Sequence, residues 1–289
     1  MVSVLNLSWM DTVECAGRMW TWRAPPPRSR LDMTRFQKMH GLGNDFVILD
    51  ARLESVAMDA ARARAIADRR TGVGCDQVIL LEPSDVADLR MRIWNSDGGE
   101  VGACGNAARC VVLLEGGAAT IETAGGIVSG DAAGVDMGSP RFGWEEIPLS
   151  YAMDTGTMPV GWEDLTAPSA VNVGNPHVVF FVRDADAVDL ARLGPLIEHD
   201  PLFPERVNVN IASFEGDAIR LRVWERGAGL TSACGTGACA SAVAAIRGKL
   251  AASPVEVRLP GGTLTIAWAP GETIRMSGPA THVFSGELP

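Results

Sequence analysis

The chain repeats part of its own sequence, and this repetition limits what it can fold into. The segment Arg92–Gly105 is similar to the segment Arg222–Gly235, which lies 130 residues further along, and Cys104 and Cys234 occupy the same place in each. Internal similarity of this kind indicates two copies of one structural unit. We therefore expect two pseudo-symmetric lobes that carry one thiol each, with both thiols facing a cleft between the lobes.

The pattern of apolar residues indicates a mixed α/β fold in each half. Short strand-like runs alternate with helical patterns at 59–70, 105–114, 188–198 and 235–246. The last of these is small and apolar on every side, which is typical of an enclosed helix. The expected fold class is α/β, with two lobes that are each a β-sheet or barrel wrapped around a central helix beginning at its cysteine.

A Pro- and Gly-rich stretch separates the two halves and contains the predicted linker. We expect an N-terminal lobe of residues 33–148 completed by about 278–289, and a C-terminal lobe of residues 149–277. Residues 1–32 hold three tryptophans and a proline run, and the regular pattern begins only at Met33. We interpret residues 1–32 as a disordered extension or as the artefact of an upstream start codon.

Composition excludes several classes of function. The net charge of −10 disfavours nucleic acids and anionic membranes as partners. The two lysines of the chain, Lys38 and Lys249, lie in no recognisable motif for a pyridoxal phosphate Schiff base, so we expect no cofactor. The cysteine spacings do not match a zinc knuckle, so no metal is expected. With no signal peptide and no apolar run of membrane-spanning length, we expect a cytoplasmic protein.

Cys104 and Cys234 each precede a predicted helix, where free backbone N–H groups favour anions. This placement predicts a lowered thiol pKa and a site for a substrate carboxylate, which Gly105 and Gly235 would let approach closely. An acid and a base on opposite faces of one carbon can invert a stereocentre. A single cysteine would be interpreted as a buried core residue, but two at matched positions favour a function. Cys75, Cys110 and Cys239 are expected to be structural.

A series of motifs runs in order from about Met33 to the end of the chain. They are Lys38–Phe46, Gly74–Gln77, Asn95–Gly98, Cys104–Asn106, Gly174–His177, Glu205–Asn208, Glu225–Gly227, Ala233–Ala238 and Leu259–Gly262. Together they resemble the motifs of the diaminopimelate epimerase family. That family interconverts LL- and meso-diaminopimelate without a cofactor, on the route to lysine and peptidoglycan.

The resemblance implies roles for individual residues. Cys104 and Cys234 would be the acid–base pair, and His177 and Glu225 would tune the pKa of the thiols. The substrate would be bound by Asn44, Gln77, Asn95, Gly105, Asn106, Asn175, Asn208, Glu225, Arg226, Gly235 and Thr236. The resemblance also implies a small-molecule substrate, diaminopimelate, and a homodimer.

Three residues depart from the family pattern. Ala107 and Gly99 replace a usual glycine and serine, and Leu230 replaces a glutamate in the loop before Cys234. Two alternatives stay open beside the epimerase, of which only the second is supported by these departures, through Leu230 and Ala107. One is a proline or hydroxyproline racemase or small-dicarboxylate isomerase of the same fold, and the other is a non-catalytic binding protein derived from the epimerase.

Overall fold

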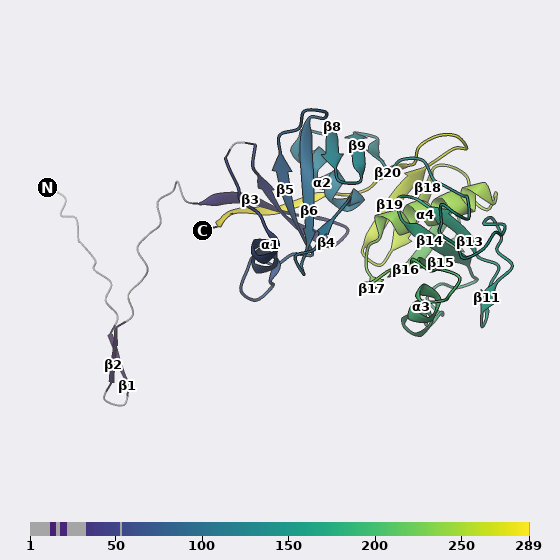
Figure 1. Cartoon of the computed structure of the whole chain (residues 1–289), viewed down its shortest axis with the longest axis horizontal. Coiled ribbons are helices and arrows are strands. Elements are labelled where there is room, and N and C mark those ends of the chain that lie inside the picture. Colours follow the sequence, from purple (N-terminus) through teal and green to yellow (C-terminus); the bar gives the residue numbers. More distant parts are fainter. Residues whose placement is uncertain (1–11, 16–17, 22–32, 53, 289) are drawn as a thin grey trace.

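The computed structural model describes residues 12–15, 18–21, 33–52 and 54–288, and for residues 12–21 only the backbone. It contains two lobes that lie side by side, one around helix α2 (Gly105–Leu114) and one around helix α4 (Gly235–Arg247), as Figure 1 shows. The prediction for residues 1–32 falls mostly outside the described residues. Within that range, strands β1 (Thr12–Cys15) and β2 (Arg18–Thr21) pair as a hairpin.

The first half pairs its strands in a fixed order around α2. Strands β4 and β5 are parallel, β5 and β6 are antiparallel, and β6 pairs parallel to β8 across the crossover helix α2. The elements of this half besides α2 are β3 (Thr34–Gly41), β4 (Asn44–Asp50), α1 (Ala60–Ala67), β5 (Gln77–Glu82), β6 (Leu89–Asn95), β7 (Glu100–Val101), β8 (Ala119–Thr123), β9 (Gly126–Asp131) and β10 (Gly134–Asp136).

The second half repeats this plan element by element. Strands β14 and β15 are parallel, β15 and β16 are antiparallel, and β16 pairs parallel to β18 across α4. A small hairpin, β11 (Gly161–Trp162) and β12 (Leu165–Thr166), precedes it. The other elements are β13 (Ser169–Asn172), β14 (Pro176–Phe181), α3 (Leu190–Glu198), β15 (Asn208–Glu215), β16 (Ala218–Glu225), β17 (Gly229–Thr231), β18 (Val255–Leu259), β19 (Gly262–Ala267) and β20 (Arg275–Ser277).

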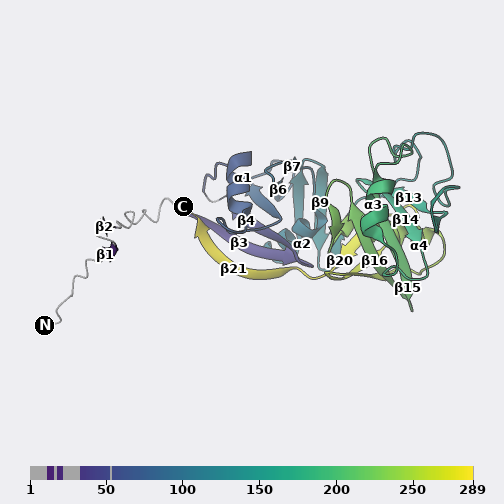
Figure 2. The ribbon, with the colours of Figure 1, turned by 90° about the horizontal axis from the view of Figure 1, so that it is seen from below.

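The two halves are joined through strands near their pseudo-symmetry axis. Strand β10 pairs antiparallel with β20, in the register Val135 to Met276. After β20 the chain returns to the first lobe, where β21 (Thr281–Leu288) pairs with β3, and Figure 2 shows the two strands running alongside each other. In the same way, the segment after β10 reaches the second lobe, where Arg141 bridges to Asn172. Each half therefore contributes one segment that pairs with strands of the other half.

Each central helix is enclosed in its own core. Residues of α2 such as Val111 pack with Ile79 and Ile93 of the surrounding strands, and residues of α4 such as Val243 pack with Leu221 and other strand residues of the second half. Helices α1 and α3 cover the opposite faces of the strands and form two separate cores. The packing explains why α4 is apolar on every side: it faces strands in all directions.

Most predicted elements are present at their predicted places. The fold class is confirmed: two duplicated α/β lobes each hold a central helix that starts after its cysteine. Strand β13 and the β11–β12 hairpin were not predicted, because they lie in or beside the stretch taken as a linker. Among the described residues, no helix has the length and apolar character needed to cross a membrane.

Candidate active site

The two predicted catalytic cysteines occupy equivalent positions. Cys104 and Cys234 are the N-cap residues of α2 and α4, and both have extended backbone conformations, with φ of −149° and −126°. An extended N-cap residue turns its side chain toward the free N–H groups of the first helical turn. The Cys234 sulfur accepts a hydrogen bond from the Gly237 backbone N–H at 3.3 Å and lies 3.6 Å from Oγ1 of Thr236.

The first turns of the two helices converge on Met276. A Cβ atom placed on Gly105 would lie 2.8 Å from the methyl carbon of Met276, and one on Gly235 would lie 3.2 Å from its sulfur. The same atom on Gly235 would be 3.4 Å from Oδ1 of Asn106. Glycine after each cysteine therefore lets the two helix N-termini approach one another. Two sets of free backbone N–H groups end close together, which suits binding of an anion.

Asn44 and Asn106 connect the first cysteine to the turn between β3 and β4. Nδ2 of Asn106 donates to Oδ1 of Asn44 at 3.1 Å, and the Cys104 thiol lies 3.9 Å from the same oxygen. Nδ2 of Asn44 donates to the Asp76 carboxylate at 3.0 Å. The structure thus brings these two predicted binding residues together with the thiol.

Gln77 and Asn95 are adjacent on neighbouring strands. They are register partners of β5 and β6, and Nε2 of Gln77 donates to Oδ1 of Asn95 at 2.9 Å. Oε1 of Gln77 is buried and has no partner. The repeat places Asn208 and Glu225 at the equivalent positions of the second half, on β15 and β16. A substrate donor could satisfy the free oxygen of Gln77.

His177 is fully buried and bonded on both nitrogens. Oδ1 of Asn175 lies 2.9 Å from its Nε2, and Nδ2 of Asn210 lies 3.1 Å from its Nδ1. The neutral tautomer with hydrogen on Nε2 satisfies both contacts. Burial lowers the pKa of His177 to about 3, so it is uncharged near neutral pH. Its hydrogen bonds go to asparagine amides and not to a thiol, so tuning of the cysteines by His177 stays a prediction.

Asn208 holds the start of the Glu225–Gly227 turn. Its Oδ1 accepts from the backbone N–H of Arg226 at 2.9 Å, and its Nδ2 donates to the carbonyl of Pro176 at 2.9 Å. The guanidinium of Arg226 is exposed and donates to the carbonyl of Glu205 at 2.9 Å. Arg226 therefore has a free face toward solvent, where a ligand can reach it.

Burial raises the pKa of both thiols, and the charge of Glu225 raises it further. Backbone N–H groups at the helix N-termini oppose this shift but do not outweigh it. The predicted lowering of the thiol pKa is therefore wrong for this structure, because desolvation of a buried thiolate exceeds the stabilisation by the helix end. Because one carboxylate acts on both sulfurs, Cys104 and Cys234 share an electrostatic environment. Oε1 of Glu225 is held by Oγ1 of Thr231 at 2.5 Å.

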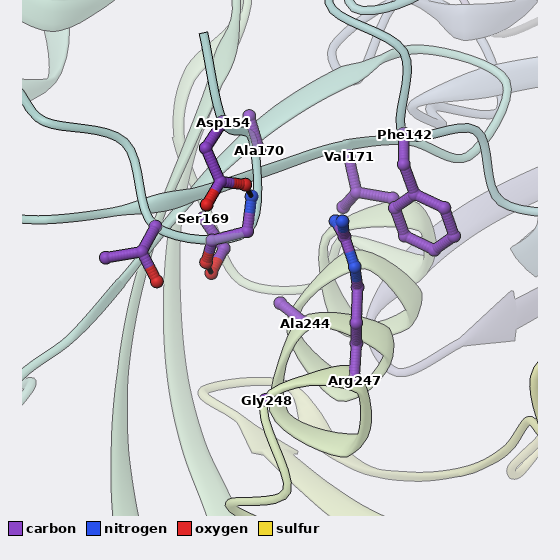
Figure 3. Close-up of a pocket in the computed structure, with 10 residues that line it drawn as sticks. Phe142, Asp154, Ser169, Ala170, Val171, Ala244, Arg247 and Gly248 are labelled. Atoms are coloured by element: carbon purple, nitrogen blue, oxygen red, sulfur yellow. Dashed lines mark hydrogen bonds between the residues drawn. The ribbon is translucent and has the colours of Figure 1, made fainter.

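One cavity of the described structure lies away from the cysteines. It has a volume of about 270 Å³ at the C-terminal end of α4, where Arg247 lies over the ring of Phe142 (Figure 3). Asp154 and Ser169 line its other side.

In the part of the chain that the structure describes, no group of three or more His, Cys, Asp or Glu side chains is placed to hold a metal ion.

Sequence reasoning missed several residues at this site. Asn210 lies two residues after Asn208 on β15, so strand periodicity could have placed both on one face. Asp76, which orients Asn44, lies inside a recognised motif but was not singled out. Thr231 meets Glu225 through the hairpin of β16 and β17, so local pairing could have found it. Nothing in the local sequence marks Met276, since its position follows from the pairing of β20 with the distant strand β10.

The sequence is similar to known proteins over most of its length. The pattern of the family described as "Diaminopimelate epimerase" matches residues 36–142 and 169–283. The diaminopimelate epimerase of Rhizorhabdus wittichii is 68% identical over 259 residues, which cover 88% of this chain and 94% of that protein. The diaminopimelate epimerase of Erythrobacter litoralis is 66% identical over 257 residues, covering 87% and 96%.

Solved structures share the fold at low sequence identity. A phenazine biosynthesis protein of Bacillus anthracis superimposes with a TM-score of 0.62 at 17% identity, covering 89% of this chain and 99% of that one. A hydroxyproline epimerase of Agrobacterium vitis gives a TM-score of 0.58 at 17% identity, covering 89% and 91%. These likenesses establish the two-lobed architecture and do not distinguish one substrate from another.

Proposed function

The chain belongs to the diaminopimelate epimerase family, and we propose that it interconverts LL- and meso-2,6-diaminopimelate with Cys104 and Cys234 as the acid–base pair. The reaction is an isomerisation on the route to lysine and peptidoglycan precursors, and the proposed mechanism needs no cofactor. The observation that carries the mechanism is the convergence of two helix N-termini, each preceded by a cysteine, on the side chain of Met276.

The proposed step moves one proton off the α-carbon and another onto it. The thiolate of one cysteine takes the α-proton, and the thiol of the other gives its proton to the opposite face of the same carbon. Before and after each turnover, the two sulfurs hold one proton between them. Their pKa values therefore belong to the pair of cysteines and not to either one alone. Because burial and Glu225 raise the pKa of both thiols, the thiolate is a strong base toward a weakly acidic carbon.

Charge on the carbanion is stabilised by the helix ends. The free N–H groups that follow Gly105 and Gly235 would bind the α-carboxylate, together with the side chains of Asn106 and Thr236. Fixed donors in a site that excludes water stabilise developing negative charge more than water does. Closure of the lobes over the substrate would exclude that water.

The far end of the substrate has its own amino and carboxylate groups. Arg226 has a solvent-facing guanidinium that can take the distal carboxylate in a two-point contact. Asn95 and Asn208 can donate to the same carboxylate, and Glu225 can accept from the distal amino group. Asn44, Gln77 and Asn175 would complete the pocket around the carbon chain.

Solvent exchange at the α-carbon tests this function. LL-diaminopimelate incubated with the protein in D₂O should become meso-diaminopimelate with deuterium at the inverted carbon, as followed by NMR. Exchange into proline or hydroxyproline in its place would support the racemase alternative, and no exchange into any of these amino acids would support a binding protein. The binding-protein alternative rests on two residues, Ala107 and Leu230, the latter 46% exposed on β17.

Assembly and location complete the proposal. We propose a first lobe of residues 33–148 with about 278–289 and a second lobe of residues 149–277. The pairing of β21 with β3 supports the return of the C-terminal segment to the first lobe, whereas Arg141 and Ile147, at the end of the first range, pack against the second half. A homodimer is supported by the exposed apolar side chains Val283 and Phe284 on β21. A mechanism that needs two free thiols is suited to a reducing compartment such as the cytoplasm.

A further inference from the structure

A guanidinium is buried between the two lobes with almost no polar partner. Arg109, in the second turn of α2, is 5% exposed, and its Nε and Nη2 atoms make no hydrogen bond. Its Nη1 lies 3.6 Å from the sulfur of Met276, which is a weak acceptor. Burying a cation without an anion is costly by several kcal/mol. The buried guanidinium of Arg109 therefore needs a negative charge nearby, because its hydrogen bonds to the protein do not compensate for its burial.

The repeat places a cysteine, and not a second arginine, at the position equivalent to Arg109. Cys239 stands 130 residues after Arg109, at the equivalent place in α4, and the two helices are in contact. The charge of Arg109 acts on the Cys239 thiol, so the two side chains lie near one another. Gly41 leaves room for the guanidinium, since a Cβ there would lie 2.9 Å from Nη2.

The ionisable groups around Arg109 are thiols. The groups whose charge would act on Arg109 are the thiols of Cys104, Cys110 and Cys239. Burial raises the pKa of Cys110 and of Cys239 to about 12, so these two stay protonated near neutral pH. Cys104 is the one of the three at the helix N-terminus, and the charge of Arg109 opposes the upward shift of its pKa. Glu225 on β16 is the other titratable group whose charge acts on Cys104, and the same carboxylate acts on Cys234 at the start of α4.

We propose that Arg109 is the permanent counter-cation of the thiolate that Cys104 and Cys234 share. This role rests on the proposed function, and it makes Arg109 a positioning residue that acts through the cysteines. Arg109 lies five residues after Cys104 on α2. It packs against Gly41 and against Met276, the side chain on which the two helix N-termini converge.

The charge balance supports this role. The cysteine pair carries one negative charge before and after each turnover, and that charge moves to the substrate carbanion in between. The protons that move come from the α-carbon and from one thiol, while Arg109 keeps its own proton throughout. A fixed cation behind the two helix N-termini stabilises the anion in each of these states without taking part in proton transfer. The effect is larger at Cys104, because Arg109 acts on that thiol directly and lies on the same helix.

The test is alkylation of the two thiols as a function of pH, read by peptide mass spectrometry after treatment with iodoacetamide. Arg109→Met keeps the length and loses the charge, Arg109→Lys keeps the charge, and Arg247→Met removes an exposed arginine at the far end of α4 as the control. We expect Arg109→Met to raise the apparent pKa of Cys104 by about one unit or more, which slows its alkylation near neutral pH about tenfold. Cys234 should shift less, and the lysine and control variants should follow the wild type.

The rate profile gives a second measurement. The acid limb of kcat/KM against pH should move upward in Arg109→Met with little change in KM. A folded Arg109→Met protein whose Cys104 alkylation profile matches the wild type would overturn the proposal, even if its activity falls. If Arg109→Met does not fold, Arg109→Gln replaces it, and an unshifted profile there would likewise overturn the proposal. Alkylation needs no substrate, so this result is separate from the deuterium test of the function itself.

Discussion

Asn106 donates a hydrogen bond to Oδ1 of Asn44 at 3.1 Å, and the Cys104 thiol lies 3.9 Å from that same oxygen. Nδ2 of the same Asn44 amide donates to the carboxylate of Asp76, which forms an ion pair with Arg69. The amide therefore has one favoured orientation, with its oxygen toward the thiol. The ion-paired carboxylate of Asp76 thus orients the amide that lies beside the Cys104 sulfur.

Asp76→Ala should lower kcat/KM by roughly 10- to 100-fold, as expected for loss of a hydrogen bond worth about 1–3 kcal/mol. Without its acceptor, the Asn44 amide can rotate and turn its NH₂ group toward Cys104. Steady-state kinetics on diaminopimelate measure this effect. Asp88→Ala, which removes a surface carboxylate bonded to Thr120, is the matched control and should keep wild-type kinetics.

Cys104→Ala and Cys234→Ala should each abolish epimerisation while the protein stays folded. The prediction follows from the need for a base on one face of the carbon and an acid on the other. Circular dichroism checks the fold, and the deuterium assay checks the reaction. Turnover near the wild-type rate in either variant would rule out the two-base mechanism.

Gly237→Ala should reduce activity at least 100-fold, because a misplaced catalytic group loses its reactive geometry. A Cβ there would lie 2.7 Å from Oδ1 of Asn210 and 3.2 Å from the Cys234 sulfur, so the thiol must move. The equivalent residue of the first half is already Ala107, which is fully buried. Ala107→Gly is therefore the control: it should keep the rate within a few-fold and cost roughly 1 kcal/mol of stability.

Arg226→Ala should lower kcat/KM for diaminopimelate by roughly two to four orders of magnitude, given about 3–5 kcal/mol for loss of one partner of a desolvated charge pair. Arg192→Ala, which breaks the exposed ion pair with Glu163, should have no such effect. Lysine lacks the distal carboxylate and should be a very poor substrate for the wild type. Equal rates on lysine and diaminopimelate would show that the distal pocket is assigned wrongly.

His177 should make the fold sensitive to acid. Burial depresses its pKa from 6.5 to about 3 in the folded state, so the unfolded chain binds a proton more readily. The resulting stability is complete above about pH 6.5 and is lost as the pH falls toward 3. The urea midpoint of His177→Gln should fall less between these pH values than that of the wild type. Parallel pH profiles for the two proteins would mean that other groups control acid unfolding.

Sequence reasoning succeeded where local pattern and tertiary structure agree. The helix predicted at 105–114 is present with those bounds, and the helix predicted at 235–246 ends one residue later. Both begin at the glycine of a cysteine–glycine pair and carry an apolar run, so capping and burial act together. Strand β13 was missed because its four residues gain their strand conformation from pairing with β14.

The thiol pKa shows what sequence could not supply. The cysteines were correctly placed at helix N-termini, yet their depth of burial decides the direction of the shift, and depth depends on packing between the halves. Arg109 is a second case. An arginine in an apolar helix is usually expected to reach solvent, but packing against Gly41 of β3 and Met276 of β20, both distant in sequence, encloses this one.

The pairing of β3 with β21 determines when the first lobe can be completed during synthesis. Strand β3 leaves the ribosome early, but its partner consists of Thr281–Leu288, at the end of the described chain. The second lobe has all the strands of its repeat, from β13 to β20, before that point. The half that is made later can therefore finish its sheet first, while the earlier half keeps an unpaired strand edge. Contacts this distant in sequence slow folding and leave an edge open to aggregation.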